Sequence, residues 1–275
     1  MAQPSQEQPP RSISGKTALD VAVEAARLAG GIIRERFRSS KEINFKGRKD
    51  IVTDVDLAAE KAILELLQGE FPDFSVLAEE SKPLETGSPF TWVVDPLDGT
   101  RNYAAGVPHF CTVVALSFGN KPVVGVTYDP MRDEMFTAEQ GQGAYLNGDR
   151  LEVSENKKVS EALLCCDLGY VDEKAGLALD MIRSLWPDMV SLRLMGSSAL
   201  GVAYAAANRV DLYFHHSLSP WDIAAGHVLV REAGGVIVDK QGQPADLRTP
   251  SIIASNQQLV DDFLKRTDGL PWRSA

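Results

Sequence analysis

Residues 91–100 read TWVVDPLDGT, an apolar strand that ends in two carboxylates, Asp95 and Asp98. Pro96 has no N–H group and restricts the backbone between the two acids. Gly99 and Thr100 follow where a helix is expected to begin, so their backbone N–H groups are left without helical partners. Carboxylates beside free N–H groups suit a divalent cation that lies between the protein and an anionic ligand. The stretch therefore predicts metal-assisted hydrolysis of a phosphate ester.

Other acidic residues also stand at the ends of apolar segments. Glu79 and Glu80 follow a strand-like segment at 75–78, and Asp222 opens a helix-like segment. Any one of these acids could be a solvated turn residue, but their combination with DPLDGT favours a site. A set of donors made only of oxygen suits Mg²⁺ or Mn²⁺ better than zinc. A further acidic cluster surrounds Val52-Thr53, namely Asp50, Asp54 and Asp56.

Hydrophobic periodicity predicts a different pattern of helices and strands in each half of the chain. In the first half, the pattern predicts helices at 17–37 and 56–67, followed by short strands. Asp54 or Asp56 is expected to be the N-cap of the helix at 56–67. Those strands are expected at 75–78, 92–94, 111–118, 123–128, 134–137 and 144–146. The second half alternates strands with helices. The strands are expected at 163–166, 191–194, 211–214 and 236–238, and the helices at 173–186, 197–207 and 221–233. We therefore predict an α+β domain over 15–155 with the first acidic motif and an α/β domain over 156–275 with the second. Residues 1–14 are rich in Gln, Pro and Ser and are expected to form a disordered tail.

Composition excludes several classes of protein. A formal net charge of -10 over 275 residues disfavours nucleic acid as a partner. No apolar run approaches the roughly 20 residues of a membrane span, so no membrane partner is expected. Three cysteines, two of them adjacent (Cys165 and Cys166), fit core positions in a reducing compartment, so we expect a cytoplasmic location. The four histidines are scattered and suggest no catalytic relay.

Two stretches resemble the signatures of a known family. Residues 92–103 resemble the first signature of the inositol monophosphatase superfamily, the magnesium-dependent, lithium-sensitive phosphatases that include fructose-1,6-bisphosphatase. Residues 221–226, together with Glu232-Ala-Gly-Gly235, resemble the second signature. Order and spacing agree along residues 17–265. The resemblance implies a layered αβαβα sandwich, a homodimer, and two or three Mg²⁺ ions for which Mn²⁺ may substitute.

The resemblance also implies a role for each matching position. The first metal would be held by Glu79, Asp95 and the backbone carbonyl of Leu97. The second would be held by Asp95, Asp98 and Asp222, of which the last two also face the substrate. Thr100, paired with Asp56, would orient the attacking water, and Glu79 would help to activate it. The N–H groups of Gly99 and Thr100 would bind phosphate oxygens, and Lys46 would offset charge near the entrance. Glu80 matches the ligand position less well than Glu79.

Simpler explanations stay open for several of these residues. Thr100 could only cap a helix, Asp56 could only be an N-cap, and Lys46 could be an ordinary surface lysine. Gly196 and Ser197 precede a predicted helix, where they either bind an anion or the hydroxyl groups of a substrate, or simply cap the helix.

The substrate is where the chain departs from the family pattern. Inositol phosphatases carry an acidic residue seven positions before the second-signature aspartate, and this chain has His215 there. A protonated His215 would attract a second phosphate, whereas a His215 that only caps or packs would not. The leading hypothesis is hydrolysis of a myo-inositol monophosphate. The alternatives are fructose-1,6-bisphosphatase or broad polyol and sugar phosphatase activity, and a macromolecular interaction protein built on a phosphatase fold.

Overall fold

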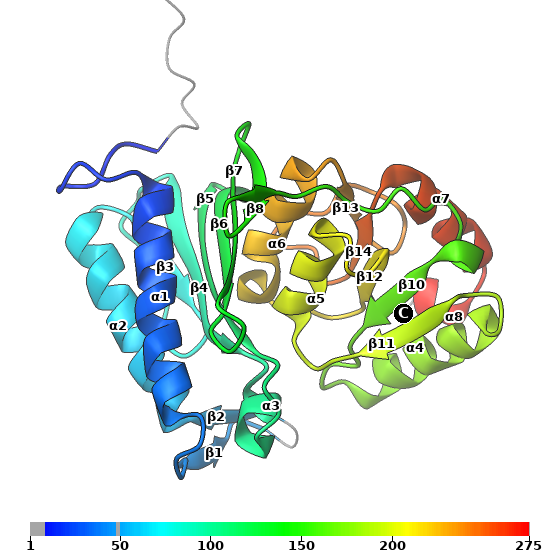
Figure 1. Ribbon diagram of the computed structural model, residues 1–275, viewed down its shortest axis with the longest axis horizontal. Helices are drawn as coiled ribbons and strands as arrows, with labels where there is room; N and C mark the ends of the chain where they lie inside the picture. The colour runs from blue at the N-terminus through cyan, green and yellow to red at the C-terminus, as the bar shows by residue number, and fades with distance from the viewer. Residues whose placement is uncertain (1–8, 48–49, 275) are drawn as a thin grey trace, which may run out of the picture.

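The computed structural model describes residues 9–47 and 50–274, which form five layers of helices and sheets (Figure 1). Helices α1 (Ala18–Arg36) and α2 (Asp54–Glu70) cover one face of a seven-stranded sheet. Helices α5 (Ser198–Ala206) and α6 (Pro220–Glu232) lie between that sheet and a five-stranded sheet. Helices α4 (Asp172–Leu185), α7 (Gln257–Arg266) and α8 (Pro271–Ser274) pack on the far face of the second sheet. The predicted layered αβαβα sandwich is confirmed.

The seven-stranded sheet is built almost entirely from neighbours in the chain. Its order is β3-β4-β5-β6-β7-β8-β9, with β3 parallel to β4 and every later pair antiparallel. The strands are β3 (Ser75–Ala78), β4 (Phe90–Asp98), β5 (Cys111–Phe118), β6 (Lys121–Asp129), β7 (Glu134–Glu139), β8 (Gly143–Leu146) and β9 (Asp149–Arg150). A separate hairpin of β1 (Ile43–Phe45) and β2 (Ile51–Thr53) precedes it, and the short helix α3 (Thr100–Ala105) follows β4. Strand β4 is longer than the predicted 92–94 because it continues through both carboxylates of the first motif.

The five-stranded sheet has the order β11-β10-β12-β14-β13. Its strands are β10 (Leu163–Cys166), β11 (Ser191–Leu194), β12 (Leu212–His215), β13 (Val236–Val238) and β14 (Ile252–Ser255), and a 3₁₀ turn, η1 (Val159–Glu161), precedes β10. β10 runs parallel to β11 and β12, as expected for strands that alternate with helices. β14 is antiparallel to both of its neighbours, so this sheet is mixed.

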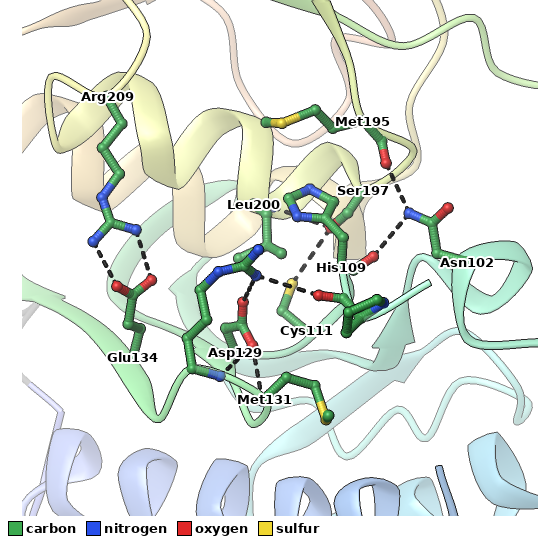
Figure 2. A network of polar contacts seen from close by, with 12 residues as sticks. Asn102, His109, Cys111, Asp129, Met131, Glu134, Met195, Ser197, Leu200 and Arg209 are labelled. Atoms are coloured by element: carbon green, nitrogen blue, oxygen red, sulfur yellow. Dashed lines mark hydrogen bonds and ion pairs between the residues drawn. The ribbon is translucent and has the colours of Figure 1, made fainter. Parts of the chain in front are cut away.

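The two halves share one core. The central layer brings side chains of both sheets into contact with α5 and α6. Helix α6 approaches β6 so closely that a Cβ atom on Gly125 would lie 2.7 Å from the carbonyl oxygen of Ala225. Polar contacts also join the halves: Arg209 donates two hydrogen bonds to Glu134, and Asn102 donates one to the carbonyl of Met195 (Figure 2). The two predicted domains therefore cannot be independent packing units, although the sheets do divide between residues 150 and 163.

Three smaller expectations can be compared with the structure. The three cysteines are buried and free, as predicted. Residues 1–8 of the expected tail lie outside the described residues. The N–H of Ile13 donates to the carbonyl of Glu70, and Ser14 donates to the Glu70 carboxylate, so the ordered chain begins before residue 15. Within residues 9–47 and 50–274, no helix is long and apolar enough to cross a membrane.

Candidate active site

A β-bulge in β4 brings the carboxylates of the first motif together. Asp95 pairs with Val113 of β5, and Asp98 pairs with Cys111, so three steps along β4 match two along β5. Residues three apart in a regular strand point to opposite faces, and one extra residue restores the same face. The N–H of Leu97 within the bulge donates to the Asp95 carboxylate at 2.9 Å. Asp95 and Asp98 thus reach one point in space from a single rigid strand.

The third carboxylate of this group comes from the other half of the chain. Asp222 lies in the first turn of α6, where its Oδ2 accepts the N–H of the N-cap residue Ser219 at 2.7 Å. One oxygen from each of Asp95, Asp98 and Asp222 lies within 4.8 Å of the others. Glu79, directly after β3, lines the same cavity of about 260 Å³. The cavity is also lined by Lys46, Asp50, Leu97, Gly99, Thr100, Tyr170, Ser219 and Trp221.

The carboxylates in this cavity are buried close together and repel one another. Burial, followed by repulsion from Glu79, Asp98 and Asp222, raises the pKa of Asp95 well above its usual range. Burial raises the pKa of Asp98 to about 6, although hydrogen bonds from Ser197 and Ala199 act against this shift. A divalent cation among these oxygens would reverse the shifts and keep the carboxylates ionised. The residues present fit such an ion, because every side-chain donor of the group is a carboxylate oxygen, the ligand that Mg²⁺ prefers.

Asp56 and Thr100 form a buried pair at the edge of this group. The Thr100 hydroxyl donates to Asp56 Oδ1 at 3.0 Å, and it lies 2.9 Å from the carbonyl oxygen of Leu97. The other Asp56 oxygen accepts the N–H of Thr53 at 2.9 Å and the Thr53 hydroxyl. Burial raises the pKa of Asp56 to about 6. The N-cap of α2 is Thr53, so the prediction of Asp54 or Asp56 as N-cap is wrong, and Asp56 instead completes a capping box three residues later.

Neither Thr100 nor Gly99 serves merely to start a helix. The N-cap of α3 is Gly99, and the Thr100 side chain bonds to Asp56 instead of to a helical N–H group. Gly99 has a φ of +91°, and a Cβ atom there would lie 3.1 Å from the carbonyl oxygen of His109 and 3.2 Å from that of Gly196. Only glycine fits this position without strain. The helix-cap explanation of Thr100 is therefore wrong.

Lys46 joins the acidic residues from the side of the β1–β2 hairpin. Its Nζ lies 2.9 Å from Glu79 Oε1 and 2.5 Å from Glu80 Oε1, and its side chain is 26% exposed. An ordinary surface lysine has no such pair of partners, so the charge-offsetting interpretation fits better. Glu80 does not line the cavity, and its backbone N–H donates to Glu60 at 2.8 Å. Burial raises the pKa of Glu80 to about 7.

A second cavity of about 340 Å³ adjoins the first and shares part of its wall. Asp98, Gly99, Tyr170, Ser219 and Asp222 line both. The second cavity is completed by Arg101, Asp167, Leu168, Gly169, Val171, Gly196, Ser198, His215, Ser217 and Leu218. It offers room for the alcohol part of a phosphate ester beside the acidic cavity.

Gly196 and Ser197, predicted together as ligand-binding residues, have different positions in the structure. Gly196 lines the second cavity, but Ser197 is 1% exposed and lines neither cavity. Its hydroxyl donates to Asp98, and it is the N-cap of α5. The expectation that Ser197 contacts a ligand is therefore wrong in this structure; Ser197 positions a carboxylate, and the next residue, Ser198, faces the cavity.

His215 lines the second cavity but is not charged there. It is 1% exposed, its Nδ1 accepts the N–H of Ser217 at 3.0 Å, and its ring stacks on His216. Burial, followed by the neighbouring His216, lowers the pKa of His215 to about 3. The imidazole is therefore neutral at physiological pH, and the expected attraction between a protonated His215 and a second phosphate is wrong.

Sequence reasoning missed Asp167. This residue follows β10, lines the second cavity, and accepts the N–H groups of Met195 at 3.0 Å and Gly196 at 2.6 Å. Burial raises its pKa to about 6. An acid directly after an apolar strand was the signal that identified Glu79 and Asp95, and it applies equally to Asp167. The capping-box spacings Thr53-x-x-Asp56 and Ser219-x-x-Asp222 were also available in the sequence.

Known proteins resemble this chain over almost all of its length. A model of the inositol monophosphatase family matches residues 16–268. Inositol monophosphatase 3 of Solanum lycopersicum is 41% identical over 256 residues, which cover 90% of this chain and 95% of that protein. Nus factor SuhB of Haemophilus influenzae is 39% identical over 252 residues, 90% of this chain and 94% of that protein.

Solved structures agree with these sequence matches. An IMPase from Thermotoga maritima superimposes with a TM-score of 0.85 at 33% identity, covering 92% of this chain and 97% of the other. The resemblance inferred from the two signatures is thereby confirmed. The chain belongs to the inositol monophosphatase family.

Proposed function

We propose that the protein is a Mg²⁺-dependent phosphomonoesterase that hydrolyses a myo-inositol monophosphate to inositol and phosphate. The observation that carries the proposal is the meeting of Asp95, Asp98 and Asp222 within 4.8 Å beside the Thr100–Asp56 hydrogen bond. A purely structural cluster would not need three carboxylates that lie this close together and repel one another. Such a cluster beside a cavity is a common feature of catalytic sites.

Some residues of the acidic cavity would bind the metal ions, and others would orient the attacking water. Glu79, Asp95 and the carbonyl of Leu97 would hold one ion, and Asp95, Asp98 and Asp222 a second. When bound, Mg²⁺ supplies positive charge to the phosphate oxygens and lowers the pKa of water. The backbone N–H groups of Gly99 and Thr100 would bind further phosphate oxygens.

The Thr100–Asp56 pair fixes the direction of attack. Because the Thr100 hydroxyl donates to Asp56, its oxygen lone pairs remain available to accept a hydrogen bond from water. Asp56 is itself held by Thr53, so the pair cannot rotate freely. The oriented water forms a bond to phosphorus as the ester P–O bond breaks. Glu79 accepts a proton from this water, and that proton passes on to the oxygen of the leaving alkoxide, which departs as the alcohol.

The second cavity would hold the alcohol. Asp167, His215, Ser198 and Arg101 present polar atoms there, and His215 is neutral at physiological pH. Neutral and acidic groups suit the hydroxyls of a polyol. Fructose 1,6-bisphosphate or a wider range of polyol and sugar phosphates is the alternative, since His215 replaces the family's acidic residue. The family resemblance adds a cytoplasmic homodimer to the proposal.

A second candidate function comes from the relatives. Several of them are called Nus factor SuhB, a name that does not mention phosphatase activity. A macromolecular interaction role for this chain is therefore the alternative to catalysis. The complete carboxylate set favours catalysis, because binding a macromolecule does not require it.

The decisive experiment is release of phosphate from inositol 1-phosphate and fructose 1,6-bisphosphate, each with Mg²⁺ and with excess EDTA. We expect turnover of inositol 1-phosphate with Mg²⁺, loss of turnover in EDTA, and partial recovery with Mn²⁺. Undiminished turnover in excess chelator would contradict the metal-dependent mechanism. No turnover of either ester with any divalent cation would favour the interaction role.

A further inference from the structure

We propose that Asn102 is a positioning residue that keeps the backbone N–H groups of Gly99 and Thr100 directed at the phosphate of the substrate. The proposal rests on the phosphatase function above and adds a residue to it. Asn102 lies in α3, and it is not among the residues that line either cavity. It is also not among the site residues predicted from the sequence.

The side-chain amide of Asn102 donates hydrogen bonds to three backbone carbonyls. Its Nδ2 lies 2.7 Å from the carbonyl oxygen of Met195, 2.8 Å from that of His109 and 3.2 Å from that of Gly196. These carbonyls belong to two separate segments, the residues that lead into β5 and the loop before α5, and Figure 2 shows the amide bonded to Met195 and His109. One side chain of α3 therefore joins both segments.

Two of these carbonyls also frame Gly99. A Cβ atom on Gly99 would lie 3.1 Å from the carbonyl oxygen of His109 and 3.2 Å from that of Gly196, so the Gly99 backbone is held between them. The amide of Asn102 binds both carbonyls and keeps the two segments together around this turn. Glycine has the most freedom of any residue in its backbone angles, so the direction of the N–H groups at this turn depends on such neighbours.

Gly196 gives Asn102 a rigid surface to pack on. Gly196 has a φ of +81°, and a Cβ atom there would lie 3.0 Å from Nδ2 and 3.2 Å from Oδ1 of Asn102. The amide thus rests directly on the backbone of Gly196, an approach that a side chain at Gly196 would obstruct. On its other side, the N–H of Gly196 donates to Asp167 at 2.6 Å. Asn102 therefore ties the Gly99 turn to a loop that is itself fixed.

The carboxylates proposed as metal ligands have supports of their own. Asp95 and Asp98 are placed by the bulge and by the pairing of β4 with β5. Asp98 also accepts the N–H of Ala199 at 3.0 Å and the hydroxyl of Ser197. Loss of the Asn102 amide should therefore weaken the binding of phosphate more than the binding of Mg²⁺.

The test measures the affinity for inorganic phosphate, the product that would occupy the place of the ester phosphate. At saturating Mg²⁺, the Ki of inorganic phosphate is measured together with kcat and KM for inositol 1-phosphate. We expect Asn102→Ala to raise Ki and KM together by about tenfold, the scale of weakening a hydrogen bond to a charged group. The Mg²⁺ concentration for half-maximal activity should change much less. Asn102→Ser keeps one donor, so its Ki should lie between those of Asn102→Ala and the wild type.

Asn256→Ala is the matched control. The amide of Asn256 also joins remote segments, since it donates to the carbonyls of Ser154 and Asn156, each at 2.7 Å, but Asn256 lines neither cavity. Asn256 is in addition the N-cap of α7. Its replacement should therefore lower the melting temperature at least as much as Asn102→Ala does, while Ki and KM stay at their wild-type values. The pair of variants separates positioning from a general loss of stability.

The outcomes that overturn the inference differ from those that overturn the function. If Asn102→Ala lowers the melting temperature but leaves the Ki of inorganic phosphate unchanged, Asn102 is only structural and the phosphatase function stands. The same holds if Asn256→Ala raises Ki equally, or if the Mg²⁺ requirement of Asn102→Ala rises as much as its Ki.

A binding measurement keeps the inference testable without turnover. If the wild type hydrolyses no ester, the phosphatase function fails, and inorganic phosphate is then titrated calorimetrically into the protein with Mg²⁺ present. Tighter binding by the wild type than by Asn102→Ala would support the positioning role. Equal affinities, or no binding by either protein, would overturn it.

Discussion

The two acidic motifs place their carboxylates by different physical means. In the first, a bulge in β4 turns Asp95 and Asp98 to the same side of one strand in the middle of a sheet. In the second, a capping box at the start of α6 fixes Asp222, with one oxygen on the N–H of Ser219. The first arrangement is local to four residues, whereas the second depends on where a whole helix packs.

This difference implies that the two motifs should respond differently to mutation. A substitution at Asp95 removes a proposed ligand, while β4 stays held by its pairing with β5. Asp222 can be displaced by changes far from the site, because α6 is held against β6 by the close approach of Ala225 to Gly125. The following predictions test that contrast, in order of decreasing effect.

Asp95→Asn is expected to cause the largest loss. Asp95 is the residue assigned to both metals, so removing its charge weakens both, and we expect kcat to fall on the order of 10³-fold, the scale of removing a principal electrostatic group. Asp222→Asn should mainly raise the Mg²⁺ concentration needed for half-maximal activity. Steady-state kinetics across a Mg²⁺ titration distinguishes the two variants.

The fold provides the control for this comparison. In metal-free protein, Asp95→Asn should not lower the melting temperature, because burial and repulsion by Glu79 already disfavour the ionised Asp95 carboxylate. Equal behaviour of Asp95→Asn and Asp222→Asn in the Mg²⁺ titration would remove the contrast between the motifs. If Asp95→Asn had the kcat of the wild type, Asp95 would have only a structural role.

Thr100→Ala should reduce kcat with little change in KM. In the proposed mechanism its hydroxyl, held by Asp56, orients the water and does not hold the alcohol, and misplacing the attacking water costs about 10²-fold. Thr100→Ser keeps the hydroxyl and should recover most of the rate. If Thr100→Ala instead raised KM at constant kcat, the water-orienting role would be wrong.

Gly125→Ala should disturb the second motif from a distance. The new methyl group would meet the Ala225 backbone at 2.7 Å, so α6 must shift, and we expect a loss of about 1–3 kcal/mol in the free energy of unfolding. A higher Mg²⁺ requirement should accompany it, since Asp222 moves with α6. Thermal or denaturant unfolding and the Mg²⁺ titration measure both effects.

Gly176→Ala is the matched control. Gly176 lies in α4, and a Cβ atom there would have nothing within 4 Å. Replacing a helical glycine by alanine at such a site should stabilise by about 0.5–1 kcal/mol. A Gly125→Ala variant that was equally stabilised would show that α6 does not need this close approach.

The smallest effect is expected from His227 in α6. Replacing it should change how the free energy of unfolding depends on pH. Burial, followed by the charge of Arg231, lowers its pKa to about 3, and neither ring nitrogen has a hydrogen-bond partner among the described residues. Between about pH 6.5 and pH 3 the unfolded state binds the proton that the folded state excludes. Its contribution to stability is therefore complete above about pH 6.5 and is lost as the pH falls, with a slope of at most about 1.4 kcal/mol per pH unit.

His227→Leu should flatten this slope. An apolar side chain of similar volume also removes two unpaired polar atoms, so stability at pH 7.5 should be unchanged or slightly higher. Denaturant unfolding at pH 7.5 and pH 5 measures the slope for both proteins. An equal slope in the variant and the wild type would mean that His227 finds a partner in solution.

The elements of the fold were largely predictable from the sequence, and the reason lies in particular residues. Strands at 75–78, 111–118 and 163–166 were bounded correctly because each is a mostly apolar run that ends directly before an acidic residue or a glycine. β4 was predicted too short, since a strand with two acids and a proline is rare outside a bulge. The antiparallel position of β14 depends on sheet order, which no local pattern encodes.

The residues of the candidate site, like the elements of the fold, were only partly predictable from the sequence. The two signatures gave Asp95, Asp98 and Asp222, because family spacing and acids at strand ends are properties of the chain itself. Ser197 was expected either to contact a ligand or to cap a helix. The structure shows the cap and buries Ser197 against Asp98, because a sequence does not say which of two adjacent residues turns inward. His215 was expected either to be protonated and attract a second phosphate or only to pack, and the burial that decides between the two could not be known before the fold.

The sequence by itself determined the chemistry of this protein: the oxygen donors, the glycine at Gly99 and the capping boxes that fix Asp56 and Asp222. These are local, because the covalent spacing of a few residues sets which groups a strand end or a helix start can present. Only the tertiary structure decided that Asp222 meets Asp95 from the other half of the chain, that His215 stays neutral and that Arg101 faces a second cavity. Burial, and the distance between charges remote in sequence, arise when the two sheets pack around α5 and α6, and they set the electrostatics of the site.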